Sequence, residues 1–400
     1  MRRSFVKKSM AELPSSGIRK FFDMASSIRG VISLGVGEPD FVTPWHIREA
    51  SVYALEKGYT NYTANSGLAE LRKEIGRHLL QKYQVEYNYD KEIIVTVGAS
   101  EAIDLALRSV IDPGDEVIIP EPCFVSYKPC TAMAGGVFKT IPTREGEHFK
   151  LMPQNLEKAI TPRSKVLLLS YPNNPTGATM TGKELAQIGR IAQQHDLLVI
   201  ADDIYSELTF NGEHVSFASL PGMQERTILI NGFSKSFAMT GWRIGYAAAP
   251  ADITAAMLKI HQYTVMCAPI MGQMAALEAL KNGNGEVKKM ADQYDQRRNL
   301  IVNGLRQMGL SCFEPSGAFY AFPSIKKTGM SSGEFCEKLL QEEKVAVVPG
   351  STFGRCGEGY IRCSYASSVE QISEALERMD RFMQRHAKAG VTTSSLSASP

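Results

Sequence analysis

The 400-residue sequence has no apolar run of the roughly 20 residues that a bilayer-spanning helix needs. Its opening segment, MRRSFVKKSMAELP, is basic but lacks the apolar stretch of a signal peptide. We therefore expect a cytoplasmic protein with no membrane partner.

Metal-binding spacings and an excess of charge of one sign are also missing. The seven cysteines form no C-x-x-C pair, and the histidines show no metal-ligand pattern, so reduced thiols and no metal site are expected. The 44 Lys and Arg residues nearly balance the 42 Asp and Glu residues, leaving a net charge of +2. This balance argues against a nucleic-acid partner.

What the sequence does contain is enough apolar surface for a sizeable core. Hydrophobic residues make up 44% and charged residues 22%, and the length corresponds to about two or three domains at roughly 150 residues each. Short runs rich in Val and Ile alternate with helical patterns, which is typical of a mostly parallel sheet covered by helices on both faces. We therefore predict an α/β fold with strands at Ile93–Val97, Val117–Ile119, Val137–Ile141, Val166–Leu169, Leu197–Ile200, Ile228–Ile230 and within Trp242–Ala249.

The pattern changes near residue 285, where Lys281-Asn-Gly-Asn-Gly follows a helical stretch predicted over Ala251–Leu280. Beyond it we expect a helix over Glu286–Met308, short strands, and a helix over Ser368–His386. The predicted organisation is an N-terminal arm that also contributes to a small domain (1–43, with a helix at Gly17–Ser27), a large domain (44–285), a small α+β domain (286–386) and a disordered tail (387–400).

Polar residues that could carry chemistry follow four of the predicted strands. Ligands of open α/β sheets bind beyond the carboxyl ends of the strands. Singly, each group has an ordinary interpretation as a helix cap, a turn or a surface lysine. The presence of all four groups at strand ends favours a single ligand-binding site. The four groups are Gly98-Ala99-Ser100, Asn173-Asn174-Pro175-Thr176-Gly177, Asp202-Asp203-Ile204-Tyr205, and Ser234-Lys235 with Arg243 eight residues after Lys235.

These motifs, in this order, resemble those of fold type I pyridoxal-phosphate aminotransferases of the aspartate and aromatic aminotransferase family. The resemblance extends over about Phe22 to Arg385, and the Ser-Lys-x5-Gly-Trp-Arg pattern around Lys235 is its most specific part. It implies a seven-stranded, mostly parallel sheet with a smaller α+β domain, and a homodimer with shared sites. Further matches are Gly37-Glu38-Pro39-Asp40, Tyr62, Phe124 and Arg362.

The resemblance also implies a role for each matched residue. Lys235 would be the catalytic lysine that binds the cofactor aldehyde and moves the substrate proton, and Asp202, rather than Asp203, would face the pyridine nitrogen. Asn174 and Tyr205 would donate to the ring oxygen, and Phe124 would stack on the ring. The phosphate would bind Ala99, Ser100, Ser234 and Arg243, with Tyr62 from the neighbouring subunit, and the substrate carboxylate would bind Arg362, Gly37 and Asn174.

Two departures from the family pattern bear on the substrate. Aspartate-preferring relatives often have a lysine where Ser100 stands and a tryptophan where Phe124 stands, and the stretch Gly317-Ala-Phe-Tyr-Ala-Phe-Pro323 looks like that of aromatic aminotransferases. We therefore expect an aromatic L-amino acid as donor and 2-oxoglutarate as acceptor in a ping-pong exchange. Candidates for binding the second carboxylate of 2-oxoglutarate are His46, Arg19 and Arg29. Aspartate or another amino acid, a β-eliminating carbon–sulfur lyase, and a non-catalytic sensor remain alternatives.

Overall fold

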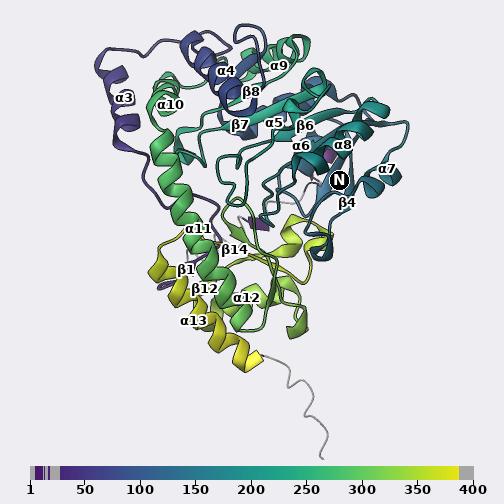
Figure 1. The fold of residues 1–400 in the computed structure, drawn as a ribbon, viewed down its shortest axis with the longest axis vertical. Helices are drawn as coiled ribbons and strands as arrows, with labels where there is room; N and C mark the ends of the chain where they lie inside the picture. Colours follow the sequence, from purple (N-terminus) through teal and green to yellow (C-terminus); the bar gives the residue numbers. More distant parts are fainter. Residues whose placement is uncertain (1–4, 12, 14–16, 19–27, 387–400) are drawn as a thin grey trace, which may run out of the picture.

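The computed structural model describes residues 5–11, 13, 17–18 and 28–386. Helices pack around a central seven-stranded sheet in a first lobe (Figure 1). The long helix α11 (Asn284–Gln307) leads from this lobe to a second one, which contains α12 (Ser332–Glu343) and α13 (Val369–His386).

The sheet of the first lobe has the strand order β2-β8-β7-β6-β5-β3-β4. Only β8 runs antiparallel to its neighbours, so the predicted mostly parallel, seven-stranded sheet is confirmed. The strands are β2 (Ile93–Thr96), β3 (Glu116–Glu121), β4 (Val137–Pro142), β5 (Ser164–Leu169), β6 (Leu198–Asp202), β7 (Thr227–Gly232) and β8 (Gly245–Ala248).

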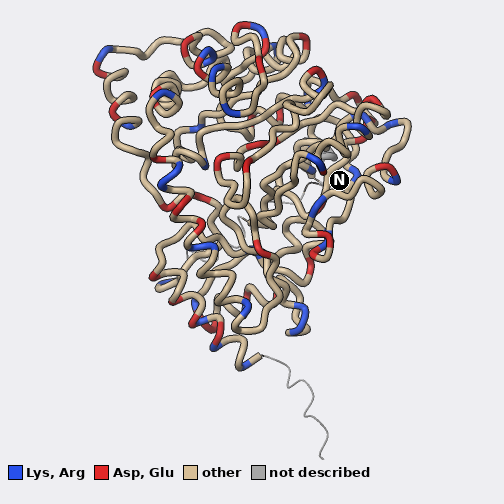
Figure 2. The backbone as a smooth tube through the Cα atoms, viewed as in Figure 1, with Lys and Arg blue, Asp and Glu red and all other residues tan. Residues whose placement is uncertain are grey.

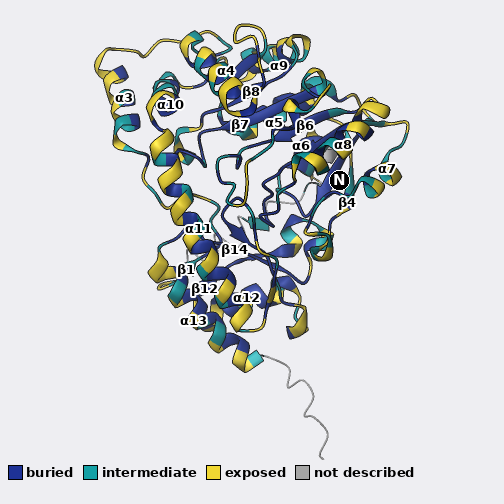
Figure 3. Cartoon of the chain, viewed as in Figure 1, coloured by how far each residue is buried: buried dark blue, intermediate teal, exposed yellow. Residues whose placement is uncertain are grey.

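Central strands of this sheet are covered on both faces, as their unbroken apolar runs predict. Every residue of the inner strands β3, β7 and β8 is buried, and so is every residue of the edge strand β2, whereas the other edge strand, β4, is largely exposed (Figure 3). The other helices described are α1 (Lys8–Ala11), α3 (Trp45–Glu56), α4 (Ala69–Tyr83), α5 (Gly98–Val110), α6 (Tyr127–Met133), α7 (Pro153–Ala159), α8 (Gly182–Gln194), α9 (Ala251–Thr264) and α10 (Ile270–Asn282).

Small sheets build the second lobe. β1 (Ile32–Ser33) pairs with β12 (Val345–Ala346), and β9 (Ser311–Cys312) pairs with β11 (Pro323–Ser324). A three-stranded antiparallel sheet has the order β10-β14-β13, formed by Tyr320–Ala321, Ile361–Ser364 and Val348–Pro349.

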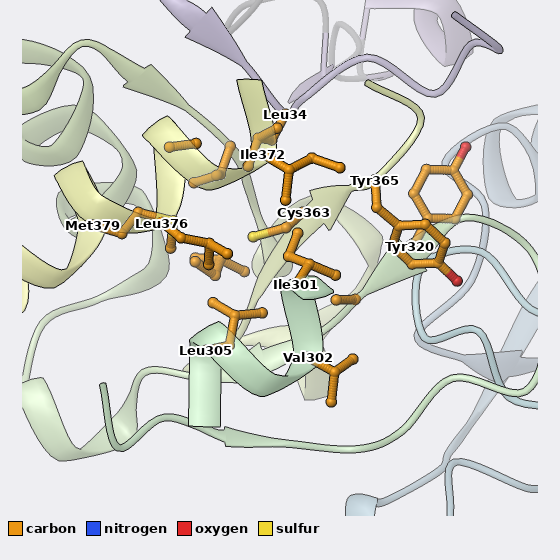
Figure 4. Packing of buried hydrophobic residues seen from close by; sticks show 14 of the residues in the cluster. Leu34, Ile301, Val302, Leu305, Tyr320, Cys363, Tyr365, Ile372, Leu376 and Met379 are labelled. Carbon is orange, nitrogen blue, oxygen red and sulfur yellow. The ribbon is translucent and has the colours of Figure 1, made fainter. Parts of the chain in front are cut away.

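The core of the second lobe also receives side chains from the first. Helix α13 contributes Ile372, Leu376 and Met379, whose spacing of three or four residues places them on one helix face. They pack with residues of α11 and β14 (Figure 4). Tyr205 and Leu208, which follow β6 in the first lobe, belong to the same cluster. This shared core fixes the position of the second lobe against the strand ends.

One helix prediction is wrong. The stretch predicted as a single helix over Ala251–Leu280 is split between α9, which ends at Thr264, and α10, which begins at Ile270. Pro269 precedes α10, and a proline inside a helix removes a backbone N–H and clashes with the preceding turn. The chain turns here through Met266, which has a φ of 73°.

Other expectations are not tested by the structure. Of the helix expected at Gly17–Ser27, only residues 17 and 18 lie within the described part, and the tail at 387–400 lies outside it. The division into domains near residue 285 stays a prediction.

Within the described ranges, no helix is long and apolar enough to cross a membrane. Basic and acidic residues are interspersed along the chain (Figure 2).

Candidate active site

A cavity of ≈ 340 Å³ lies where the carboxyl ends of several sheet strands face β10 and β14 of the second lobe. Every residue to which we assigned a role in binding the cofactor or the substrate α-carboxylate lines this cavity, except Tyr62. Those brought together are Gly37, Ala99, Ser100, Phe124, Asn174, Asp202, Tyr205, Ser234, Lys235, Arg243 and Arg362.

One end of the cavity is suited to an anion. Helix α5 begins at Gly98, so the N–H groups of Ala99 and Ser100 lie in its first turn, where helical N–H groups lack intrahelical acceptors. Gly98 has a φ of 76°, and a Cβ there would stand 2.5 Å from Nη2 of Arg243. Glycine at this position therefore lets the guanidinium pack against the start of the helix.

Arg243 is held in this position by an unusual backbone conformation. Its φ is 58°, in the left-handed region, and its Nη1 donates to the carbonyl oxygen of Thr240 at 3.0 Å. Ser234 adds a buried hydroxyl to the same cavity. A helix N-terminus, an arginine and a hydroxyl together favour a phosphate group.

A buried carboxylate lies deeper in the cavity, at the end of β6. Asp202 is 4% exposed; it accepts a hydrogen bond from the Tyr127 hydroxyl at 2.7 Å and from the backbone N–H of Ile204 at 3.3 Å. Burial raises the pKa of Asp202 to about 6. Asp203 does not line the cavity, and its Oδ2 lies 3.3 Å from Nε2 of His214.

Lys235 follows β7 and is only partly exposed. Its Nζ donates to the carbonyl oxygen of Gly37 at 2.6 Å and lies 5.8 Å from the centre of the Phe319 ring. Burial, followed by the nearby charge of Arg362, lowers the pKa of Lys235 to about 8. A lysine with such a pKa has an appreciable neutral fraction near neutral pH and can act as a nucleophile.

Arg362 extends from β14 and is 2% exposed. Its Nη1 donates to Oδ1 of Asn174 at 2.9 Å, and its Nη2 donates to the carbonyl oxygen of Gly35 at 2.7 Å. Its Nε is buried and has no hydrogen-bond partner among the described residues. The guanidinium therefore retains a donor that a carboxylate could satisfy.

The Asn174 side chain has a defined orientation as a result. Its Oδ1 accepts from Arg362, so its amide nitrogen is left to donate to another group. Tyr205, which is 4% exposed, has its hydroxyl 2.7 Å from that of Tyr320, and either oxygen could be the donor.

Some predicted residues lie apart from the cavity. Tyr62 is 80% exposed. Neither His46 nor Arg29 lines the cavity, and Arg19 lies outside the described residues. Phe124 does line it, with its ring edge-to-face to that of Tyr127 at 5.6 Å between centroids.

Several residues that line the cavity had no role predicted from the sequence. Glu38 and Tyr320 belong to motifs that carried the resemblance, so they could have been proposed as site residues. Tyr127 gave no such signal, because its contact with Asp202 joins residues 75 positions apart. The missed residues are Ile18, Val36, Glu38, Ile103, Tyr127, Ser170, Ile204, Thr240 and Tyr320.

Comparison with known proteins identifies the family. The family model described as aminotransferase class I and II matches residues 29–379. The chain belongs to this family and is a transaminase of the class that uses pyridoxal phosphate, which confirms the resemblance stated from its motifs.

Individual relatives cover nearly the whole chain. The Bacillus subtilis protein YugH is 56% identical, covering 96% of this chain and 99% of its own. The aspartate aminotransferase of Pyrococcus abyssi is 46% identical, with coverages of 92% and 96%. The solved structure of an aromatic aminotransferase from Pyrococcus horikoshii is 45% identical, covers 91% of this chain and 99% of its own, and has a TM-score of 0.88.

The lowered pKa of Lys235 leads to a prediction for the cofactor-free protein. Trace labelling with acetic anhydride at a series of pH values, followed by peptide mass spectrometry, should give a labelling midpoint at about 8 for Lys235. Replacing Arg362 by glutamine should raise that midpoint, because a nearby positive charge is removed.

Lys165 is the internal control, because its hydrogen bond to Asp115 raises its pKa. A Lys235 midpoint at or above that of Lys165 would show that the cavity does not favour the neutral amine.

Proposed function

We propose that this aminotransferase transfers the amino group of an aromatic L-amino acid to 2-oxoglutarate in two half-reactions at one site, with pyridoxal 5′-phosphate as its cofactor. The observation that carries the proposal is the content of one cavity: an anion cradle, a buried carboxylate, a lysine with a lowered pKa and an arginine with a free donor.

The residues present fit this cofactor. The N–H groups of the first turn of α5 and the guanidinium of Arg243, which packs against Gly98, suit the phosphate. Bound pyridoxal phosphate would supply an aldehyde for amines and a ring that accepts electrons. Asp202 would face the ring nitrogen and favour its protonated form, and the hydrogen bond from Tyr127 would hold that carboxylate in place.

The ring oxygen and the ring face also have partners. Asn174 has a free amide nitrogen to donate to the ring oxygen, since its own oxygen accepts from Arg362. Tyr205 is the second donor. Phe124 would cover the ring face, because it lines the cavity beside Tyr127.

Lys235 would move the substrate proton. Its partly neutral amine can take a proton from the substrate α-carbon and later return one, which is general acid–base catalysis by a group with a pKa near the working pH. Arg362 would bind the substrate carboxylate through its free Nε and one terminal nitrogen, beside the Gly37 backbone. This clamp orients the α-carbon toward Lys235.

The preference for an aromatic side chain rests on the charges in the cavity. The cations among its described lining residues are Lys235, Arg243 and Arg362, and each already has a proposed role. None of them is left to bind a side-chain carboxylate of aspartate. The apolar and aromatic lining residues without a role proposed above would surround the substrate side chain: Ile18, Val36, Ile103, Ile204 and Tyr320.

We further propose a homodimer in which Tyr62 reaches the phosphate of the partner's site. The loop that carries Tyr62 lies against the α9–α10 connection, since Nδ2 of Asn65 donates to the carbonyl oxygen of Met266 at 2.8 Å. Exposed apolar side chains gather on these segments and on α3, as expected for a subunit interface. They are Trp45, Val52, Tyr53, Leu55, Tyr59, Tyr62, Tyr263, Val265 and Met266.

A product assay tests the substrate proposal. With 2-oxoglutarate as acceptor, phenylalanine or tyrosine should give glutamate and the matching aromatic oxo acid. Aspartate should react with a kcat/KM at least roughly tenfold lower, since its short side chain would hold its second carboxylate among the apolar lining residues, whereas the second carboxylate of 2-oxoglutarate reaches one carbon farther.

The same assay also distinguishes the alternative functions, a preference for aspartate and β-elimination. A higher kcat/KM for aspartate would overturn the aromatic preference. Release of pyruvate and thiol from cystathionine without glutamate formation would indicate a β-eliminating lyase.

Hybrid dimers test the shared site. The Lys235→Ala and Tyr62→Ala variants should each be weakly active when the cofactor is limiting. Co-expressed, they should form hybrids with about half the wild-type activity per dimer, because one of the two sites then has a native Lys235 and a native Tyr62 from its partner.

Each parent variant, assayed alone under the same conditions, is the control. No recovery in purified hybrids would show that Tyr62 does not act across the interface.

A further inference from the structure

Tyr320 contacts both Tyr205 and Arg362 in the candidate site, and the roles proposed above do not account for these contacts. It lies on β10, is 1% exposed, and pairs with Ser364 in the neighbouring strand β14. Figure 4 shows it in the second-lobe core close to Tyr365. Its hydroxyl nevertheless reaches the cavity, 2.7 Å from the hydroxyl of Tyr205.

The ring of Tyr320 supports the proposed carboxylate clamp. Cζ of Arg362 lies 4.3 Å from the centre of this ring and 4.9 Å from the centre of the Phe353 ring. Contacts of this length with aromatic rings stabilise a guanidinium, and more strongly where water is excluded. The ring therefore helps to position a charge that is almost completely buried, since Arg362 is only 2% exposed.

The hydroxyl of Tyr320 has a defined partner and little room to move. Both tyrosines are protonated at neutral pH, since burial raises their pKa values. A Cβ on Gly37 would stand 2.4 Å from the Tyr320 hydroxyl oxygen, so the backbone closes over it. If Tyr205 uses its single proton for the ring oxygen of the cofactor, then the hydrogen bond between the tyrosines must be donated by Tyr320.

We propose that Tyr320 is a positioning residue that couples the two halves of the site: its hydroxyl donates to Tyr205, and its ring holds the guanidinium of Arg362. This inference rests on the proposed function, because it takes the cofactor-facing role of Tyr205 and the substrate-facing role of Arg362 from it. A donor to Tyr205 polarises its O–H bond and strengthens the hydrogen bond that Tyr205 gives to the ring oxygen.

Two variants separate the two contributions. Tyr320→Phe removes the hydroxyl and keeps the ring, and Tyr320→Leu removes both. Tyr365→Phe is the matched control, because Tyr365 is a buried tyrosine of the same core whose hydroxyl donates to the carbonyl oxygen of Ala318 at 3.3 Å, outside the cavity.

The first measurement is the pH titration of the visible band of the cofactor-loaded protein without substrate. A weaker donor leaves the ring oxygen more negative, so it holds the proton shared with the Lys235 nitrogen more tightly. Tyr320→Phe should therefore shift the titration midpoint upward by roughly half a pH unit, whereas Tyr365→Phe should leave it unchanged.

The second measurement separates KM from kcat. Tyr320→Phe should lower kcat about threefold with little change in KM, whereas Tyr320→Leu should also raise KM for the amino acid roughly tenfold through the loss of the ring contact.

An unchanged midpoint in Tyr320→Phe, or a shift that Tyr365→Phe reproduces, would overturn the inference, and the Phe variant alone suffices if Tyr320→Leu does not fold. A wild-type protein that shows no visible band after loading would instead contradict the proposed function.

Discussion

The active site depends on a buried arginine that has no carboxylate beside it. Arg362 makes no ion pair with any residue that the structure describes, and burying such a charge costs free energy unless dipoles or an anion compensate for it. Two oxygens and two aromatic rings compensate for it in part, and its Nε is left without a partner among those residues. The guanidinium therefore attracts a carboxylate and disfavours a second positive charge close to it, so it also contributes to the lowered pKa of Lys235.

The fold explains how these groups come together. Parallel strands place their carboxyl ends at one edge of the sheet, so Asp202 and Lys235 lie near each other although they follow different strands. The second lobe adds Arg362 and Tyr320 from antiparallel neighbours, β14 and β10. A core that includes Tyr205 joins the lobes, which means that packing energy from the second lobe also fixes the position of Tyr205, for which we propose a cofactor-facing role. The choice of substrate would then depend on the residues around Arg362. The described lining residues there include apolar side chains, and each lining cation already has a proposed role.

Much of this could be predicted from the sequence, for physical reasons. Strands buried on both faces require unbroken apolar runs, so the sheet was recognisable, and polar residues directly after those runs, such as Asp202 and Lys235, were candidates from their position alone. Their individual roles came from the resemblance of the motifs. The break before Pro269 was missed because the apolar pattern continues across it, although the proline itself was a signal. Tyr127 could not be assigned in this way, because no motif contains it and its contact is one hydrogen bond to a residue distant in sequence. Tyr320 belongs to a recognised motif, but its contact with Tyr205 also joins residues distant in sequence.

The central claim is that Lys235 is the residue that binds the cofactor aldehyde, and the most direct test is chemical. The wild-type protein would be loaded with pyridoxal phosphate, reduced with borohydride to fix any covalent link, digested and mapped by mass spectrometry. Our account predicts a single modified position, Lys235, and loss of that modification when phenylalanine is added before reduction, because the substrate amine takes the place of the lysine. Modification of a different lysine, or a Lys235 peptide that stays unmodified after loading, would contradict the account.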